Sequence, residues 1–150
     1  MNIRKAKISD VEQLRLLVNF YADKGLMLKK SLNDFYENIR DFYIAEEENT
    51  IIACCALHPS WADLAEIKSL AVEDKQKGKG IGSKLVELCL QEAKEIGMKR
   101  VFVLTYRDDF FKKFGFKPIV KEELPHKIWN ECVNCPKFPD CDEIALITDL

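Results

Sequence analysis

The sequence has no apolar run of membrane-spanning length, and its N-terminal stretch, Met1–Asp10, lacks the apolar segment of a secretion signal. It also lacks an excess of positive charge, because 23 lysines and arginines stand against 25 acidic residues. A basic face is the usual mark of a nucleic-acid-binding protein, so the net charge of −2 gives no reason to expect that class. We therefore expect a cytoplasmic protein that needs neither a membrane nor a nucleic acid as its partner.

Repeats, low-complexity tracts and interdomain linkers are absent as well. A chain of 150 residues is long enough to close one hydrophobic core, so we predict a single domain over residues 1–150. Six cysteines in a cytoplasmic chain indicate reduced thiols and not a disulfide framework. Cys54, Cys55 and Cys89 lie in apolar runs and are predicted to be small core residues. The other three belong to a cysteine-rich segment at about 126–141.

The hydrophobic periodicity predicts a mixed α/β protein. A capping box, S-D-V-E, indicates a helix that begins at Ser9 and ends at Gly25, and Ser31 begins a second, shorter helix. Further helices are predicted over residues 81–97, with an apolar face that includes Ile96, and over 108–114. The predicted strands cover residues 3–7, 42–45, 51–57, 64–72, 101–104, 116–120 and 144–148. The strand–helix–strand unit from 64 to 104 predicts one parallel crossover within a mixed sheet.

A glycine-rich loop, Q-K-G-K-G-I-G-S from Gln76 to Ser83, separates a predicted strand from a long predicted helix. It matches neither the Walker loop nor the dinucleotide-binding fingerprint. Glycines at alternate positions allow positive φ angles and a close approach of the backbone to a ligand. The converging amides and the helix N-terminus could then cradle a pyrophosphate, with positive charge from Lys75, Lys77, Lys79 and Lys84 nearby. The alternative is a glycine-rich turn that binds no ligand.

This loop resembles the acetyl-CoA motif [QR]-x-x-G-x-[GA] of GNAT acyltransferases, with Lys77 where glutamine or arginine is usual. The segment F-F-K-K-F-G-F, from Phe110 to Phe116, resembles the late GNAT motif, in which a tyrosine acts as general acid. Phe111 occupies that tyrosine's place, so the role is either unfilled or falls to Tyr106 or Thr105. A thiol has a reference pKa of about 8.5, so the thiolate can leave without strong protonation.

The resemblance implies a GNAT fold, with a mixed central sheet of six to seven strands flanked by about four helices. It implies acetyl-CoA as co-substrate and an N-acetyltransferase activity towards a primary amine. The residues that it assigns to acetyl-CoA lie in the strand before the loop, in the loop and in the late motif: Leu70, Ala71, Val72, Lys77, Gly78, Lys79, Gly80, Ile81, Gly82, Ser83 and Phe111.

Five segments also resemble, in order, the acetyltransferase domain of bacterial N-acetylglutamate synthases: I-R-K-A-K-I-S-D-V, G-L-M-L-K-K-S, I-I-A-C-C-A-L, A-E-I-K-S-L-A-V and V-F-V-L-T-Y-R. The chain is too short for the additional arginine-binding domain of the classical enzyme, so it resembles the short, stand-alone form. The resemblance implies L-glutamate as acyl acceptor, in the first step of arginine biosynthesis. A homodimer stays open.

Within this resemblance Glu66 is the catalytic base, a role that suits a carboxylate beside the thioester. Lys30, preceded by Lys29, stands where an arginine grips a glutamate carboxylate, and a lysine binds the same anion without the bidentate fork. Lys68 shares the strand face of Glu66 and either binds the second carboxylate or tunes Glu66. The alternatives are an exposed strand residue at Glu66 and a solvated lysine pair at 29–30.

The activity also has alternatives. The acceptor could be another amine, such as a peptide N-terminus or a polyamine, although a polyamine would favour acidic walls over the lysine pair. Direct transfer of the acetyl group is expected, and a cysteine nucleophile, Cys54 or Cys55, is the competing route. A non-catalytic, metal- or redox-responsive interaction module on a GNAT scaffold is the third alternative.

That third alternative depends on the cysteine-rich segment. His126, Cys132, Cys135 and Cys141 could form a tetrahedral zinc site, although the spacing is not that of a standard zinc finger. The sequence Cys-Pro also occurs beside iron–sulfur clusters. The simpler interpretation is an irregular loop stiffened by Pro136 and Pro139. We predict that catalysis requires no metal.

Overall fold

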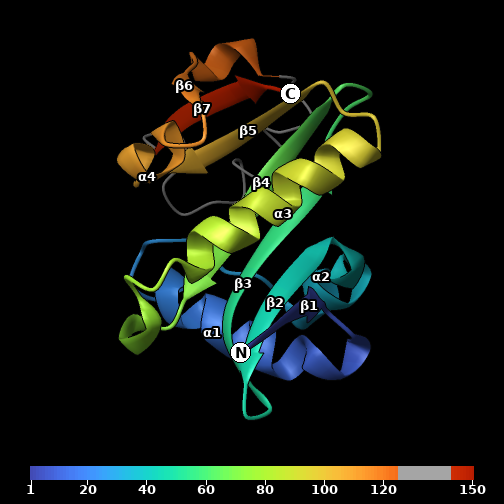
Figure 1. Cartoon of the computed structure of the whole chain (residues 1–150), viewed down its shortest axis with the longest axis vertical. Coiled ribbons are helices and arrows are strands. Elements are labelled where there is room, and N and C mark those ends of the chain that lie inside the picture. Colours follow the sequence, from blue (N-terminus) through green and yellow to red (C-terminus); the bar gives the residue numbers. More distant parts are fainter. Residues whose placement is uncertain (125–142) are drawn as a thin grey trace. The chain divides into compact units, whose positions relative to one another are not determined.

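The computed structural model describes residues 1–124 and 143–150, which form two compact units (Figure 1). Unit 1 comprises residues 1–57 and 67–92, and unit 2 comprises residues 58–66 and 93–150. The strands are β1 (Asn2–Lys5), β2 (Phe42–Glu47), β3 (Thr50–Pro59), β4 (Leu64–Val72), β5 (Arg100–Thr105), β6 (Lys117–Pro118) and β7 (Ile144–Asp149). The α-helices are α1 (Val11–Ala22), α2 (Leu32–Glu37), α3 (Ile81–Glu95) and α4 (Asp108–Lys112).

The strands follow the hydrogen-bonded order β1-β2-β3-β4-β5-β7-β6. Pairing is antiparallel for β1–β2, β2–β3, β5–β7 and β6–β7, and parallel for β4–β5. The prediction of a mixed sheet with one parallel crossover is therefore confirmed. Among the described residues no helix is both long and apolar enough to cross a membrane.

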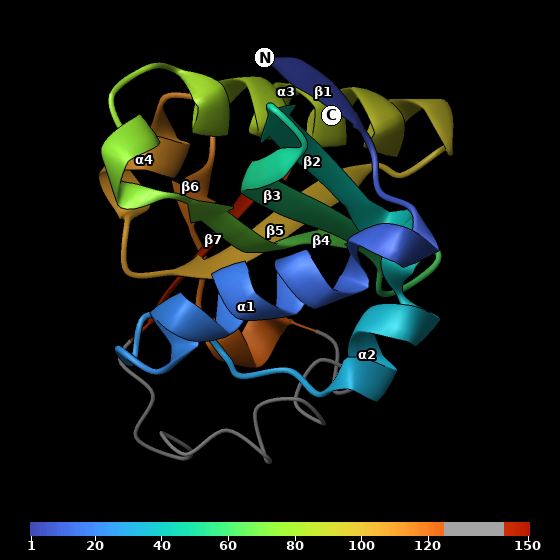
Figure 2. The same ribbon diagram turned by 90° about the horizontal axis from the view of Figure 1, so that it is seen from below.

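Unit 1 is built on an antiparallel hairpin between β2 and β3. Its turn places Glu48 and Asn49 at φ 51° and 65°, the left-handed region that a tight hairpin turn requires. Figure 2 shows α1 and α2 on one face of these strands and α3 on the opposite face. The α1 face of the unit is filled by a cluster of buried side chains: Val11, Leu14, Val18, Tyr21, Phe35, Ile39, Phe42, Ile44, Ile51, Cys54, Ala56 and Ala71.

The start of α1 differs from the prediction. A short 3-10 helix over Ile8–Asp10 precedes α1, and the main-chain N–H of Lys7 donates to Asp10 Oδ2 over 2.7 Å. The first turn therefore begins earlier than the capping-box pattern indicated, and the Asp10 carboxylate reaches back to the N–H of the residue before that turn. The second predicted cap is confirmed: Ser31 Oγ accepts a hydrogen bond from the N–H of Asp34.

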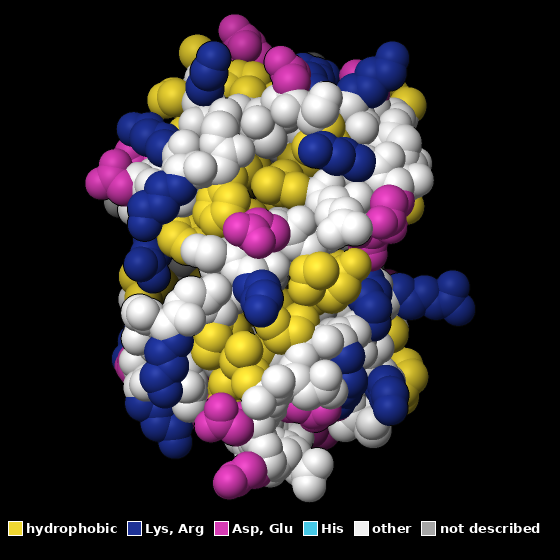
Figure 3. Space-filling model, in the orientation of Figure 1, with side chains coloured by type: hydrophobic (Ala, Val, Ile, Leu, Met, Phe, Trp, Pro, Cys, Tyr) yellow, Lys and Arg dark blue, Asp and Glu magenta, His cyan; other side chains and the backbone are white. Residues whose placement is uncertain are grey.

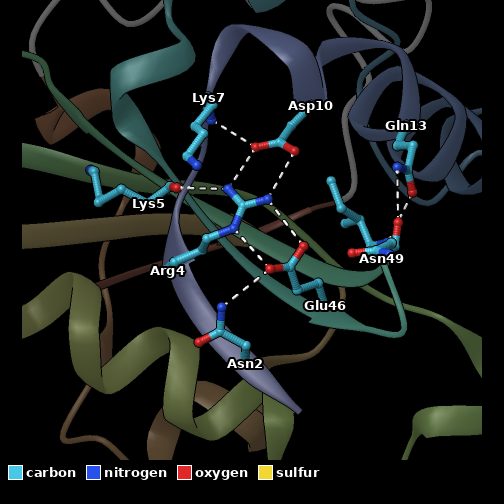
Figure 4. Close-up of polar contacts among 9 residues, drawn as sticks. Asn2, Arg4, Lys5, Lys7, Asp10, Gln13, Glu46 and Asn49 are labelled. Atoms are coloured by element: carbon cyan, nitrogen blue, oxygen red, sulfur yellow. Dashed lines mark hydrogen bonds and ion pairs between the residues drawn. The ribbon is translucent and has the colours of Figure 1, made fainter.

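Arg4 lies at the centre of a charged network between β1, the first turn and β2 (Figure 4). Its guanidinium donates to both carboxylate oxygens of Asp10, at 2.8 and 3.0 Å, and to both of Glu46, at 3.0 and 3.1 Å. Asn2 donates to Glu46 as well. The hydrogen bonds from Arg4 lower the pKa of Asp10, although burial of the carboxylate acts in the opposite direction.

This network predicts a loss of stability in acid. Because the folded-state pKa of Asp10 is lowered, its contribution is complete above the unfolded-state pKa of about 3.9 and disappears as pH falls through the folded-state pKa. Asp10→Asn should lower the free energy of unfolding at neutral pH by about 1.5–3 kcal/mol, the usual effect of a hydrogen bond to a charged group. It should also flatten the remaining dependence on pH below about 4, measured by urea unfolding.

Glu12→Gln is the matched control, because Glu12 also pairs with an arginine but lies on the surface of α1, with 61% of its side chain exposed. Such a pair contributes little, so we expect a change below about 0.5 kcal/mol. Equal losses for the two variants would contradict the role given to Asp10.

Unit 2 contains the first part of β4, together with β5, β6, β7 and α4. Leu64, Ala65 and Glu66 pair in parallel with Arg100, Val101 and Phe102. A smaller core of Leu64, Phe102, Leu124 and Ala145 is completed by Leu104, Ile119 and Ile147. Arg100 also forms a surface ion pair with Asp63, at 3.5 Å.

Most predicted elements agree with the structure to within a few residues, and β4 has the predicted bounds. Two details differ. Ile96 lies beyond the end of α3 and is 51% exposed, so it does not belong to the apolar face, whereas Val86 is fully buried. The strand predicted over 116–120 is reduced to Lys117–Pro118, because Gly115, at φ 90°, and Pro118 limit its pairing.

Candidate active site

Strand β4 carries the predicted base. Glu66 is only 8% exposed, so the alternative of an exposed strand residue is wrong. It occupies the part of β4 that belongs to unit 2, opposite Phe102 in the register with β5. Lys68, the next predicted site residue, is half-buried. A glutamate is rarely buried this deeply, which makes Glu66 a candidate for a chemical role.

Ser69 departs from the extended backbone conformation of β4. Its φ of 54° lies in the left-handed region, which is uncommon for a serine within a strand. Its carbonyl accepts a hydrogen bond from Cys54 Sγ over 3.2 Å. Its hydroxyl is buried and has no hydrogen-bond partner among the described residues. A buried polar atom of this kind fits a ligand that supplies the missing partner.

The predicted cofactor loop has the backbone that the sequence indicated. After a 3-10 turn over Asp74–Gln76, Gly78 and Gly80 adopt φ of 83° and 81°. Gly82 lies in the first turn of α3, so its role is not to supply a positive φ. Space is open around both positive-φ glycines, since a Cβ atom added to either would meet no atom within 4 Å. Figure 3 shows basic side chains on the surface at the place where Figure 1 draws this loop.

Lys77 does not extend freely from this loop. Its ammonium lies 3.1 Å from Asp74 Oδ1 and 4.9 Å from the centre of the Tyr21 ring. Tyr21, on α1, donates its hydroxyl to the Val72 carbonyl, and the same hydroxyl lies 2.9 Å from Asp74 Oδ1. The last residue of β4, the 3-10 turn and the loop lysine are thus joined to α1 within unit 1.

The other predicted cofactor residues fall into two groups. In β4, Ala71 is buried, and Leu70 and Val72 are half-buried. At the start of α3, Ile81 is buried, and Gly82 and Ser83 are half-buried. Lys79 is exposed, and its ammonium donates to the Gln76 amide oxygen over 3.0 Å. Buried Gln76 therefore braces the loop from inside.

The segment predicted to bind the acceptor follows α1. Asn19 forms two hydrogen bonds of 3.2 Å with the main chain of Lys30. The Lys30 N–H donates to Asn19 Oδ1, and Asn19 Nδ2 donates to the Lys30 carbonyl. Lys30 is half-buried, whereas Lys29 is exposed and lies 3.7 Å from a carboxylate oxygen of Asp23. The two lysines are therefore not equivalent, and Lys30 has the better-fixed backbone.

Unit 2 contains the residues considered for the general acid. Phe111 is 3% exposed and packs edge-to-face against Phe110 and Phe116, with ring centres 5.1 and 5.5 Å away. It therefore fills an aromatic core and offers no proton. Thr105, at the end of β5, accepts a hydrogen bond from the N–H of Arg107 over 2.8 Å. Tyr106 is half-buried, and its assignment as general acid stays a prediction.

The buried cysteines are poor nucleophiles. Burial raises the pKa of Cys54 to about 12. The pKa of Cys55 is also raised, first by its hydrogen bond with Cys89 at 3.7 Å and then by burial. Because the thiolate is the reactive form, these environments disfavour an acetyl-cysteine intermediate. They also agree with the prediction that the three cysteines are core residues.

Comparison with known proteins identifies the family. A sequence profile described as the acetyltransferase (GNAT) family matches residues 10–116, which is more than half of the chain. The chain belongs to the GNAT acetyltransferase family. It is an acyltransferase of the N-acetyltransferase type with the mixed α/β GNAT fold, and acetyl-CoA is its co-substrate.

For two of the relatives, the match extends over most of the relative's own length. An uncharacterized N-acetyltransferase of Chlorobaculum tepidum is 44% identical over 99% of this chain and 96% of that protein. An amino-acid acetyltransferase of Mycobacterium tuberculosis is 37% identical over 86% of this chain and 75% of that protein.

Some of the solved structures that resemble this chain contain coenzyme A. A Mycobacterium tuberculosis protein in complex with CoA and NLQ has a TM-score of 0.83 and 31% identity, over 100% of this chain and 99% of that chain. N-acetylglutamate synthase from Neisseria gonorrhoeae, complexed with coenzyme A and N-acetyl-glutamate, has a TM-score of 0.90 and 26% identity. The match covers 99% of the GNAT chain described here but only 35% of that longer protein, about a third of its length.

The predicted metal site lies outside the described residues, because Cys132, Cys135, Cys141 and His126 all fall within 125–142. Within residues 1–124 and 143–150, no group of three or more histidine, cysteine or acidic side chains is placed to hold a metal ion. That catalysis requires no metal stays a prediction.

Reasoning from the sequence missed Asn19, Tyr21 and Asp74. Asn19 lies off the apolar face of α1, whereas Tyr21 is one of the helically spaced apolar residues on it, so neither gives a local signal of its polar contacts. Asp74 lies in a run of charged residues that is typical of a solvated turn, so no role was predicted for it. Their contacts reach residues 11 and more than 50 positions away, so no local pattern could reveal them.

Proposed function

We propose that this GNAT enzyme transfers the acetyl group of acetyl-CoA directly to the α-amine of L-glutamate, the first step of arginine biosynthesis. The observation that carries the proposal is the acceptor segment, in which Asn19 fixes the backbone of Lys30. The Lys30 side chain is proposed to bind a carboxylate of the acceptor. The relative named amino-acid acetyltransferase and the synthase structure bound to N-acetyl-glutamate support the same substrate class.

Acetyl-CoA is proposed to bind the loop from Lys77 to Ser83 through its pyrophosphate. The positive-φ glycines leave open space above the backbone, and the N-terminus of α3 adds a partial positive charge. Lys79 contributes an exposed cation, while Lys77 acts first as an internal ion-pair partner. The unpaired Ser69 hydroxyl and the backbone of Leu70–Val72 are proposed to serve the rest of the cofactor.

In the proposed reaction Glu66, directly or through water, accepts a proton from the substrate ammonium. The neutral amine attacks the thioester carbonyl, a C–N bond forms, the C–S bond breaks, and coenzyme A leaves as thiolate. Tyr106 is the proposed proton donor, although a thiolate, whose acid has a pKa of about 8.5, can leave without one. Lys68 is proposed to bind the second carboxylate or to tune Glu66. A homodimer and a cytoplasmic location stay predictions.

The test of the acceptor is thiol release from acetyl-CoA with a panel of amines: the common amino acids, a polyamine and a peptide with a free N-terminus. We expect turnover with L-glutamate and far less with the polyamine, because the acceptor segment presents cations. Turnover with another amine but none with glutamate would contradict the glutamate proposal and leave the N-acetyltransferase class intact. A folded protein that binds acetyl-CoA but turns over none of these amines would favour the non-catalytic module.

Lys30→Ala should raise KM for glutamate about 10- to 100-fold, the effect of losing one charged hydrogen bond of about 1.5–3 kcal/mol. KM for acetyl-CoA should change little. Lys29→Ala is the matched variant, and its effect should be smaller, because the exposed Lys29 ammonium already faces Asp23. Steady-state kinetics with each substrate varied in turn gives both constants. A larger effect at Lys29 than at Lys30 would exchange their roles.

A further inference from the structure

The cluster around the Tyr21 hydroxyl joins three segments that lie far apart in the sequence. Tyr21, on α1, is 5% exposed, and its hydroxyl reaches both the Val72 carbonyl at the end of β4 and the Asp74 carboxylate. Asp74 also holds the Lys77 ammonium at 3.1 Å and the Lys24 ammonium at 3.9 Å. All these residues belong to unit 1.

The protonation states of the cluster agree with these contacts. Burial, and then the hydrogen bond to Asp74, raise the pKa of Tyr21 to about 12, so its hydroxyl stays a donor. Hydrogen bonds from Lys77, and then from Tyr21, lower the pKa of Asp74, so the carboxylate stays ionised at neutral pH. The positive charge of Lys77, which also faces the Tyr21 ring, is therefore balanced inside the cluster.

The cluster lies at the entrance of the glycine loop, that is, at its N-terminal end, where the backbone needs to be fixed. Gly78 and Gly80 allow this stretch of chain many backbone conformations. Restricting it to one conformation when a ligand binds costs conformational entropy. The exit of the loop is fixed by α3, whose first residue, Ile81, is 4% exposed. The entrance is held by the Tyr21–Asp74–Lys77 contacts, by buried Gln76 and by the Glu73 N–H, which donates to the Ile52 carbonyl over 2.8 Å.

We propose that Tyr21 and Asp74 are positioning residues for acetyl-CoA. They hold the entrance of the loop, through the Val72 carbonyl and the Lys77 ammonium, in the conformation that receives the cofactor phosphates. Preorganisation of this kind strengthens binding by reducing the ordering cost, so its loss weakens affinity and leaves the chemical step unchanged. Lys77 holds this end of the loop twice, through its ammonium and through its main-chain N–H, which donates to the Asp74 carbonyl over 3.3 Å. This inference rests on the proposed binding of acetyl-CoA to the loop.

The test measures the Kd of acetyl-CoA by calorimetry for Tyr21→Phe, Asp74→Asn and the double variant. Each single change should weaken binding about three- to tenfold, the effect of losing one intramolecular hydrogen bond. The double variant should lose less than the sum of the two single losses, because the contact between Tyr21 and Asp74 is shared by both changes. The kcat at saturating acetyl-CoA and the KM for the acceptor should stay as in the wild type. Lys77→Met should weaken binding, and Lys77→Arg, which can keep the ion pair, should restore most of it.

Tyr43→Phe is the matched control. It removes another tyrosine hydroxyl of unit 1, one that lies 3.4 Å from Glu92, and it should leave the Kd unchanged. Wild-type affinity in Tyr21→Phe and Asp74→Asn, or losses that simply add, would overturn the inference. So would a lowered melting temperature with an unchanged Kd, since that would show a purely structural cluster. The loop assignment is tested separately by Gly80→Val, so failure of the two proposals can be told apart.

Discussion

Gly80→Val is expected to abolish detectable binding of acetyl-CoA, with an affinity loss of at least about 100-fold, in a protein that still folds. Gly80 has φ 81°, which a β-branched residue adopts only at a cost of roughly 1–3 kcal/mol. A Cβ atom added at Gly80 would meet no atom within 4 Å, so the substitution should not disturb the core. The added side chain would instead project into the open space above the loop, where the pyrophosphate is proposed to lie. Calorimetry with acetyl-CoA, together with thermal unfolding, measures both effects.

Gly97→Val is the matched control for this experiment. Gly97 has φ 90°, and a Cβ atom added there also meets no atom within 4 Å, but it follows the opposite end of α3. The two variants should therefore lose similar stability, and only Gly80→Val should lose the cofactor. Undiminished binding in a folded Gly80→Val variant would remove the loop from the site.

Glu66→Gln is expected to lower kcat by about 10²–10⁴-fold, the usual contribution of a general base, and to leave the Kd of acetyl-CoA unchanged. Gln is nearly isosteric with Glu, so the packing of this 8% exposed side chain should survive. The loss should shrink as pH rises, because more of the substrate amine is then already neutral. Glu66→Asp keeps the carboxylate at a shorter reach and should recover part of the activity. The measurement is a kcat–pH profile for the three proteins.

The same kinetic series tests direct transfer. Both substrates must bind before either product leaves in a direct reaction, which gives intersecting patterns in two-substrate kinetics. Ping-pong kinetics, or an acetyl-cysteine trapped without acceptor, would show a covalent route instead. The raised pKa values of Cys54 and Cys55 argue against that outcome. A Glu66→Gln variant as active as the wild type would remove Glu66 from the chemistry.

The sequence by itself determined the features that depend on neighbouring residues. The alternating and helical hydrophobic patterns predicted β4 and α3. The glycines at 78 and 80 predicted the positive φ angles that the structure contains. Ser31 was recognisable as a cap because its hydroxyl serves an amide only three residues away. The family resemblance came from the same local signals, since the loop and its flanking elements are contiguous in the chain.

Only the tertiary structure decided which charges act on a ligand and which act on one another. Lys77 looked like a free cation in the sequence, but packing of α1 against the end of β4 brings it to Asp74 and Tyr21. The same helix supplies Asn19 to Lys30, while Lys29 turns to Asp23. The positive φ of Ser69 could not be predicted, because a serine within an apolar strand pattern gives no local signal for it. Such choices depend on segments that are distant in sequence and meet only after the core has formed, so no local pattern encodes them.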